Sequence, residues 1–336
     1  MSLITEIKIP EYPSKMDYSK NMMFFGSCFS ESIGQKMIDL KFNVDMNPFG
    51  ILYNPQSIAN SLKFLLDKQL FTEYDLFQDQ GLWNSFYHHS RFSDVDKDTA
   101  LEKINSRILL SHDFLKSADF LVITFGTAWV FELVSLAQVV SNCHKVPASQ
   151  FSRIRLTRHE ITEAYRYLLE ELWRFNPNLK VIFTVSPIRH WKDGAVENQV
   201  NKATLILAVD RLRKDFADRG LSYFPSYELM MDELRDYRFY AEDMLHPSSV
   251  AIDYIFDRFS KFIISKDSQH TSDKVLKIRK AALHRPVNSN SVEYEKFLQA
   301  NLEEITKLIK TYPQLNFNEE KINFEQELER FQNSRS

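Results

Sequence analysis

The 336-residue sequence contains only two cysteines, Cys28 and Cys143. No disulfide framework can be built from so few thiols, so each must be explained by packing or by chemistry. Nowhere do about 18 uncharged apolar residues run together, and residues 1–21 lack an apolar segment behind a basic stretch. The sequence therefore predicts neither a membrane span nor a signal peptide, and we expect a cytoplasmic protein without a membrane partner.

The sequence also lacks a large excess of either charge, since it has 42 basic and 45 acidic residues and a formal charge of −3. A protein that binds a phosphate backbone needs a basic surface, so nucleic acid is not an expected partner. Hydrophobic residues make up 44% and charged residues 26%, as in ordinary globular domains. The 27 Phe and 14 Tyr residues predict a core rich in aromatic rings.

Short apolar runs alternate along the chain with longer segments that have apolar residues at helical spacing. The runs typical of buried strands are residues 22–25, 42–46, 120–124, 181–185 and 221–224, and the helical segments include 31–40, 57–66, 160–175, 198–219 and 249–264. This alternation predicts an α/β fold, a three-layer α/β/α flavodoxin-like core with a parallel sheet of about five strands. Ligands of such folds lie beyond the carboxyl ends of the strands.

The sequence after residue 264 is highly charged, and its apolar spacing indicates helices near residues 292–312 and 318–331. We therefore predict an α/β domain over residues 1–264 and a C-terminal helical extension over residues 265–336. Alternating Lys and Glu usually mark a solvated helix face. The extension could pack on its own core or mediate oligomerisation.

The seven glycines of the chain are few enough for their positions to be informative. Gly26, Gly50 and Gly126 follow the first three predicted strands. Glycine permits unusual backbone angles and close backbone approach, so these positions suggest loops that converge on one ligand. Ordinary turns are the alternative interpretation.

Two segments carry reactive side chains. The first is Gly26-Ser27-Cys28-Phe29, between a predicted strand and a predicted helix, where the free N–H groups of a helix N-terminus favour a thiolate or an oxyanion. The second contains Asp243 and His246, whose spacing lets the carboxylate orient an imidazole that acts as general base. Taken alone, Ser27 would be a capping residue and Cys28 a small buried hydrophobe.

These segments resemble those of the SGNH (GDSL-like) hydrolase superfamily and, within it, of the GSCFA family. The resemblance covers about residues 20–264 and is carried by residues 26–30, 47–55, 83–89, 142–145, 184–187 and 240–247. It implies a nucleophile after the first strand, a backbone oxyanion donor at a second-block glycine, an asparagine donor in a third block, and an Asp–His pair. Gly50 matches the second block, and Asp243 and His246 match the last.

The chain departs from the superfamily pattern at two positions. Cys28, rather than Ser27, falls at the nucleophile position, so we prefer Cys28 as nucleophile and keep Ser27 as its rival. Ala128 stands where the asparagine donor is expected, and the loss of one such donor typically costs about a hundredfold in rate. Asn142 and His144 are the candidate replacements.

The resemblance implies a hydrolase or O-acyltransferase that acts on an acyl ester of a carbohydrate or another small hydroxylated molecule through a covalent acyl-enzyme. Trp129 could stack on a sugar ring and His89 could line an acceptor pocket, although such side chains more often belong to the core. We expect no cofactor and no metal for this chemistry.

Two alternatives belong to other classes of protein. A catalytically silent binding module would keep the fold, and the missing asparagine favours it. A metal-binding protein would use Cys28, Cys143, His144 and His246, although their spacing lacks the tight form of a zinc site.

Overall fold

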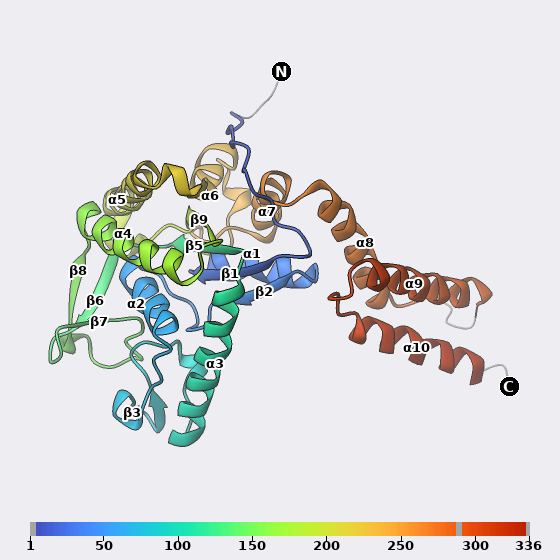
Figure 1. Ribbon diagram of the computed structural model, residues 1–336, viewed down its shortest axis with the longest axis horizontal. Helices are drawn as coiled ribbons and strands as arrows, with labels where there is room; N and C mark the ends of the chain where they lie inside the picture. The colour runs from blue at the N-terminus through green and yellow to red at the C-terminus, as the bar shows by residue number, and fades with distance from the viewer. Residues whose placement is uncertain (1–4, 287–290, 334–336) are drawn as a thin grey trace.

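The computed structural model describes residues 5–286 and 291–333 (Figure 1). At its centre lies a five-stranded sheet in the order β10-β9-β5-β1-β2, in which all neighbours are parallel. The strands are β1 (Asn21–Gly26), β2 (Asn43–Met46), β5 (Phe120–Phe125), β9 (Lys180–Val185) and β10 (Ser222–Phe224). Each lies at one of the apolar runs, so the predicted flavodoxin-like parallel sheet is confirmed.

Helices cover both faces of this sheet because successive side chains of a strand point to opposite faces. On β5, Leu121 and Ile123 point into one core and Phe120 and Val122 into the other. The first core contains α2 (Pro55–Leu66), α3 (Lys97–Ser117), α4 (Arg158–Phe175) and α5 (Gly194–Asp215), and the second contains α1 (Cys28–Asp39) and α7 (Ser249–Ile263). The three predicted layers are therefore present.

The strand order reverses direction next to β1. The chain passes from β1 to β2 on one side and later adds β5 on the other side of β1. Loops that leave the carboxyl ends of β1 and β5 diverge, and this arrangement opens a crevice in doubly wound sheets. The Gly26-Ser27-Cys28 segment and Gly126 follow these two strands.

Gly26 ends β1 in a conformation that only glycine adopts readily. Its φ is +144°, and a Cβ atom at this position would lie 2.4 Å from the carbonyl oxygen of Thr124 on β5. The N–H of Gly26 donates to Oδ1 of Asn47 at 2.9 Å, which ties the end of β1 to the loop after β2. The close approach of β1 and β5 thus requires glycine at this residue.

Two smaller sheets and one long helix were not predicted from the sequence. An antiparallel sheet in the order β7-β6-β8 consists of β6 (Trp129–Leu133), β7 (Gln138–Val140) and β8 (Phe151–Arg155), and a hairpin pairs β3 (Phe77–Asp79) with β4 (Leu82–Asn84). The helix is α3, which Asp96 caps by accepting a hydrogen bond from the N–H of Thr99. A short helix, α6 (Ser226–Glu228), follows β10.

The C-terminal segment forms α8 (Lys266–Ala282), α9 (Val292–Thr311) and α10 (Asn318–Asn333), which extend to one side of the sheet in Figure 1. Helices α9 and α10 lie where the apolar spacing indicates helices. Val275, Leu298 and Phe324 are buried in the same core as α1 and α7. This segment therefore packs on its own chain, and its predicted part in oligomerisation stays a prediction.

Among the helices of the described residues, none combines the length and the apolar character that a membrane span requires.

Candidate active site

A cleft of about 310 Å³ opens at the carboxyl ends of β1 and β5. Its walls come from the loops that follow β1, β2, β5 and β9 and from the loop that precedes α7. The lining residues are Ser27, Cys28, Tyr53, Gly126, Thr127, Ser186, Ile188, Arg189, His190, Trp191, Lys192, Leu245 and His246. The fold thus brings both predicted reactive segments to one cleft, although they are more than 200 residues apart in the sequence.

Cys28 and Ser27 differ in their access to this cleft. Cys28 is the first residue of α1, is partly exposed, and places its Sγ 3.5 Å from the hydroxyl of Tyr53. Ser27 is only 2% exposed, and its Oγ is buried without a hydrogen-bond partner among the described residues. The thiol is therefore the more accessible of the two candidate nucleophiles.

The segment with Asp243 and His246 forms a tight turn because Met244 adopts a left-handed φ of 58°. Oδ1 of Asp243 accepts hydrogen bonds from the N–H groups of His246 and Leu245, each at 2.9 Å, and Nδ1 of His246 donates to Oδ2 at 2.5 Å. The two backbone hydrogen bonds, followed by the imidazole, lower the pKa of Asp243 to about 2. The carboxylate is therefore charged at neutral pH and holds the proton of His246 on Nδ1.

Tyr53 is a site residue that sequence reasoning missed. It lies in the segment 47–55 that carries the family resemblance, but a tyrosine beside an apolar run is ordinarily a core residue. Burial, and then the hydrogen bond with Cys28, raise the pKa of Tyr53 above its usual range, so the phenol stays protonated. Its carbonyl oxygen also accepts hydrogen bonds from the N–H groups of Gly126 at 2.8 Å and Thr127 at 2.9 Å.

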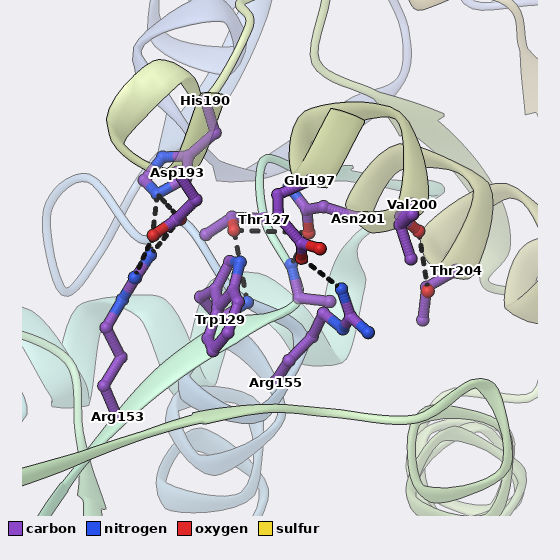
Figure 2. Close-up of polar contacts among 11 residues, drawn as sticks. Thr127, Trp129, Arg153, Arg155, His190, Asp193, Glu197, Val200, Asn201 and Thr204 are labelled. Atoms are coloured by element: carbon purple, nitrogen blue, oxygen red, sulfur yellow. Dashed lines mark hydrogen bonds and ion pairs between the residues drawn. The ribbon is translucent and has the colours of Figure 1, made fainter. Parts of the chain in front are cut away.

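The loop after β5 is held in place by Asn201 of α5 (Figure 2). Oδ1 of Asn201 accepts hydrogen bonds from the N–H of Ala128 at 2.5 Å and from Oγ1 of Thr127 at 3.3 Å. Ala128 is fully buried. No donor side chain therefore stands at the third-block position, and Asn201 supports this loop from the core.

Two other predicted site residues lie outside the cleft, next to each other. The N–H of Gly50 donates to the carbonyl oxygen of Asn47 at 2.8 Å, so the expected oxyanion donor is already engaged within a turn. Nδ1 of His89 accepts a hydrogen bond from the N–H of Arg91 at 3.2 Å. Residue 50 must be glycine, because a Cβ atom at this position would lie 2.1 Å from Cβ of His89 and clash with it.

Asn142 and His144, the candidate replacements for the missing donor, stabilise a turn elsewhere. Oδ1 of Asn142 accepts from the N–H of His144 at 3.0 Å, and Nε2 of His144 donates to the carbonyl oxygen of Ser85 at 2.8 Å. Neither belongs to the described residues that line the cleft. The structure therefore does not bring them to Cys28.

Trp129 begins β6 and presents one face of its ring to Arg153 (Figure 2). The guanidinium of Arg153 lies 4.2 Å from the ring centre. A cation therefore already lies over this ring, and Trp129 is not among the described lining residues of the cleft. Trp191, with 43% of its surface exposed, is the tryptophan of the cleft.

The positions of the proposed ligands contradict the alternative prediction of a metal site. Cys28 and His246 reach the cleft, whereas His144 is engaged with Ser85 outside it. Within the part of the chain that the structure describes, no three His, Cys, Asp or Glu side chains lie close enough to hold a metal ion. The four residues therefore do not form a set of ligands.

Lys202 is a fully buried cation directly beneath the cleft, and sequence reasoning did not find it. Its Nζ donates to the carbonyl oxygens of Gly126 and Ser186, both at 2.8 Å. Burial lowers the pKa of Lys202 to about 7. The side chain thus ties the loops after β5 and β9 together without a carboxylate in hydrogen-bond contact.

Because of Lys202, the stability of the protein should depend on pH in the alkaline range. Its pKa is about 7 when folded and near 10.5 when unfolded, so between these values the unfolded chain binds more protons. The free energy of unfolding should therefore rise through this window, by up to about 1.4 kcal/mol per pH unit. Urea unfolding at several pH values should show this rise in the wild type and not in Lys202→Met.

Lys214→Met is the matched control for Lys202→Met, because Lys214 lies on the same helix, exposed and paired with Asp210 at 2.7 Å. This variant should keep the pH dependence of the wild type. If Lys202→Met and the wild type change in parallel with pH, then Lys202 does not titrate in this window.

Two family models match most of the chain. Residues 21–259 match the family model described as the GSCFA family, and residues 275–330 match the model described as the GSCFA domain protein, C-terminal domain. No curated protein matches the chain at a significant level.

Two solved structures are similar at 11% sequence identity. One is an acetyl xylan esterase from the rumen bacterium Butyrivibrio proteoclasticus, with a TM-score of 0.36 over 76% of this chain and 66% of that one. The other is a carbohydrate esterase of family 3 from Talaromyces cellulolyticus, with a TM-score of 0.34 over 76% of this chain and 99% of that one. The family model alone spans residues 21–259, which is more than half of the sequence. This chain therefore belongs to the GSCFA family.

Proposed function

We propose that the protein cleaves or transfers the acyl group of an ester of a carbohydrate or another small hydroxylated molecule through a thioester on Cys28. One observation carries the proposal. The accessible thiol at the start of α1 shares a cleft with His246, whose Nδ1 is bound by Asp243. A nucleophile, a base and a carboxylate that orients the base are the parts of a catalytic triad.

The reaction begins with proton transfer from the thiol to Nε2 of His246. Within the described chain no hydrogen bond engages this nitrogen, since Asp243 binds Nδ1. Sγ then attacks the carbonyl carbon of the ester, and the π electrons of the carbonyl move to its oxygen. The positive end of the α1 dipole favours both the thiolate and the resulting oxyanion.

Tyr53 is the donor that we assign to this oxyanion in place of the missing asparagine. Its hydroxyl lies 3.5 Å from Sγ and stays protonated because its pKa is raised. The N–H of Cys28 stands at the first position of a helix, where no intrahelical acceptor exists. Two donors near the attacked carbon supply the stabilisation that an oxyanion hole requires.

Collapse of the tetrahedral intermediate breaks the ester C–O bond, and the alkoxide takes its proton from the imidazolium of His246. The thioester is then attacked by water or by an acceptor hydroxyl, which gives up its proton to Nε2. Sγ leaves as thiolate and recovers that proton. Hydrolysis and acyl transfer differ only in the molecule that attacks the thioester.

Labelling with an activated ester, followed by peptide mass mapping, tests the proposal. We expect one adduct on Cys28, and neutral hydroxylamine should remove it, because a thioester is cleaved under conditions in which a serine ester survives. The adduct should be absent in Cys28→Ala and kept in the control Cys143→Ala. An adduct on Ser27 that resists hydroxylamine would assign the reaction to the serine.

A catalytically silent binding module remains the second candidate, because Ala128 is buried where a donor side chain is expected. A ligand that binds the cleft tightly, with no adduct on either Cys28 or Ser27, would favour this function over an acyl-enzyme.

A further inference from the structure

Arg189 lies in the cleft, but it has no role in the reaction proposed above. Its guanidinium lies over the Trp191 ring, with Cζ 4.4 Å from the ring centre. Its Nε is buried and has no hydrogen-bond partner among the described residues. The Nε atoms of Arg153 and Arg258 are also unpartnered, although both guanidinium groups bind carboxylates. Arg189 is distinguished from them by the absence of a carboxylate partner among the described residues, and an anionic ligand would supply the missing acceptors.

The cleft as a whole carries positive charge. Its described lining includes Arg189 and Lys192 and contains no Asp or Glu. No carboxylate of residues 5–286 and 291–333 forms an ion pair with either cation. The protein itself has an acidic balance, with a formal charge of −3. Asp243, which lines the adjoining hollow, is engaged with His246, so the two cations in the lining of the cleft have no carboxylate of their own.

Arg153, which lies 3.2 Å from Nε2 of His190, is an arginine of the same region that is paired with a carboxylate (Figure 2). Its guanidinium binds both carboxylate oxygens of Asp193, at 2.5 and 2.6 Å. It also lies over the ring of Trp129. Arg189 has the same stacking on a tryptophan but lacks the carboxylate. An anionic ligand would complete the pattern that Asp193 completes for Arg153.

A second hollow of about 500 Å³ adjoins the cleft and shares Arg189, Trp191 and Leu245 with it. Tyr237 and Tyr240 line this hollow, with ring centres 5.9 Å apart. Arg189 therefore stands between the nucleophile and a space that is large enough for the rest of a small molecule.

We infer that the substrate is an anionic ester, and that Arg189 binds its carboxylate or phosphate group while the adjoining hollow takes the remainder. The inference rests on the proposed function and adds the charge of its substrate. The planar guanidinium offers two parallel N–H donors, which match the oxygen pair of either group.

Two matched pairs of esters test the inference and distinguish the position of the charge. The first pair is a butyryl and a hemisuccinyl ester of one alcohol, and the second is an acetyl ester of glycerol and of glycerol phosphate. For at least one pair we expect the wild type to have a kcat/KM about tenfold or more higher for the anionic member. Arg189→Gln should remove this preference, chiefly by raising KM for the anionic member of the pair far more than for the neutral member.

Arg235→Gln is the matched control, because Arg235 lines the adjoining hollow but is already paired with Asp232 at 2.7 Å. It should keep the preference for the anionic substrate, and Arg189→Lys should restore part of it. The inference is overturned if the wild type treats charged and neutral members alike, or if Arg189→Gln lowers the rates of all four substrates equally.

A binding measurement separates this inference from the proposed reaction. Cys28→Ala, with and without Arg189→Gln, is titrated with succinate and with inorganic phosphate. Anion binding that is lost with Arg189→Gln supports the inference even if no thioester forms in the wild type. A thioester on Cys28 together with no anion binding and no charge preference overturns the inference alone.

Discussion

Cys28→Ala is expected to lower ester turnover by about a thousandfold or more, because it removes the atom that forms the acyl-enzyme. Ser27→Ala is expected to keep most of the turnover, since Ser27 is only 2% exposed and its Oγ is buried. Steady-state rates of the purified variants on one activated ester measure both effects.

Cys28→Ser tests the chemistry of the nucleophile rather than its position. A hydroxyl is far less acidic than a thiol and needs a stronger base, so turnover should fall by about a hundredfold or more. Cys143→Ala is the control, because Cys143 is half-buried and burial raises the pKa of its thiol. If Ser27→Ala inactivates the protein and Cys28→Ala does not, the serine is the nucleophile.

His246→Gln is expected to lower kcat/KM by about a hundredfold to ten-thousandfold, which is the usual contribution of a general base. Asp243→Asn should also reduce the rate, because an amide does not stabilise the imidazolium that forms during the reaction. The pKa of Asp243 is about 2. Its carboxylate is therefore charged throughout mildly acidic pH, and a loss of activity near pH 5 must come from protonation of another group.

The control for His246→Gln is His144→Gln, since His144 donates to the carbonyl oxygen of Ser85 outside the cleft. Between pH 5 and 9, the rates of His144→Gln should be close to those of the wild type. Full activity of His246→Gln across that pH range would show that His246 is not the general base.

The central sheet could be predicted because its strands are buried on both faces. Residues such as those of β5, Phe120–Phe125, form continuous apolar runs that are visible without any knowledge of their neighbours. The strands β6, β7 and β8 are short and only partly buried, so they lack such runs. Helix α3 was missed because the exposed Leu109 and Leu110 obscure the helical spacing of its five buried positions.

Part of the candidate site was visible in the sequence because it is local. Asp243 and His246 are three residues apart, and their turn is closed by hydrogen bonds within the same segment. The position of Cys28 at the start of α1 also depends only on the residues around it. Gly50 was predicted to be an oxyanion donor, but its N–H is engaged by Asn47, and the residue occupies a turn that requires glycine.

By itself, then, the sequence determined the parallel α/β architecture, the turn at Gly26-Ser27-Cys28 before α1 and the pairing of Asp243 with His246, because periodicity and short spacing are local properties of a chain. Only the tertiary structure decided which side chains meet. Tyr53 reaches the thiol of Cys28, Lys202 lies beneath two loops, and Arg189 is left without a carboxylate. These contacts depend on how distant segments pack across the sheet, and the spacing of residues along the sequence does not determine that packing.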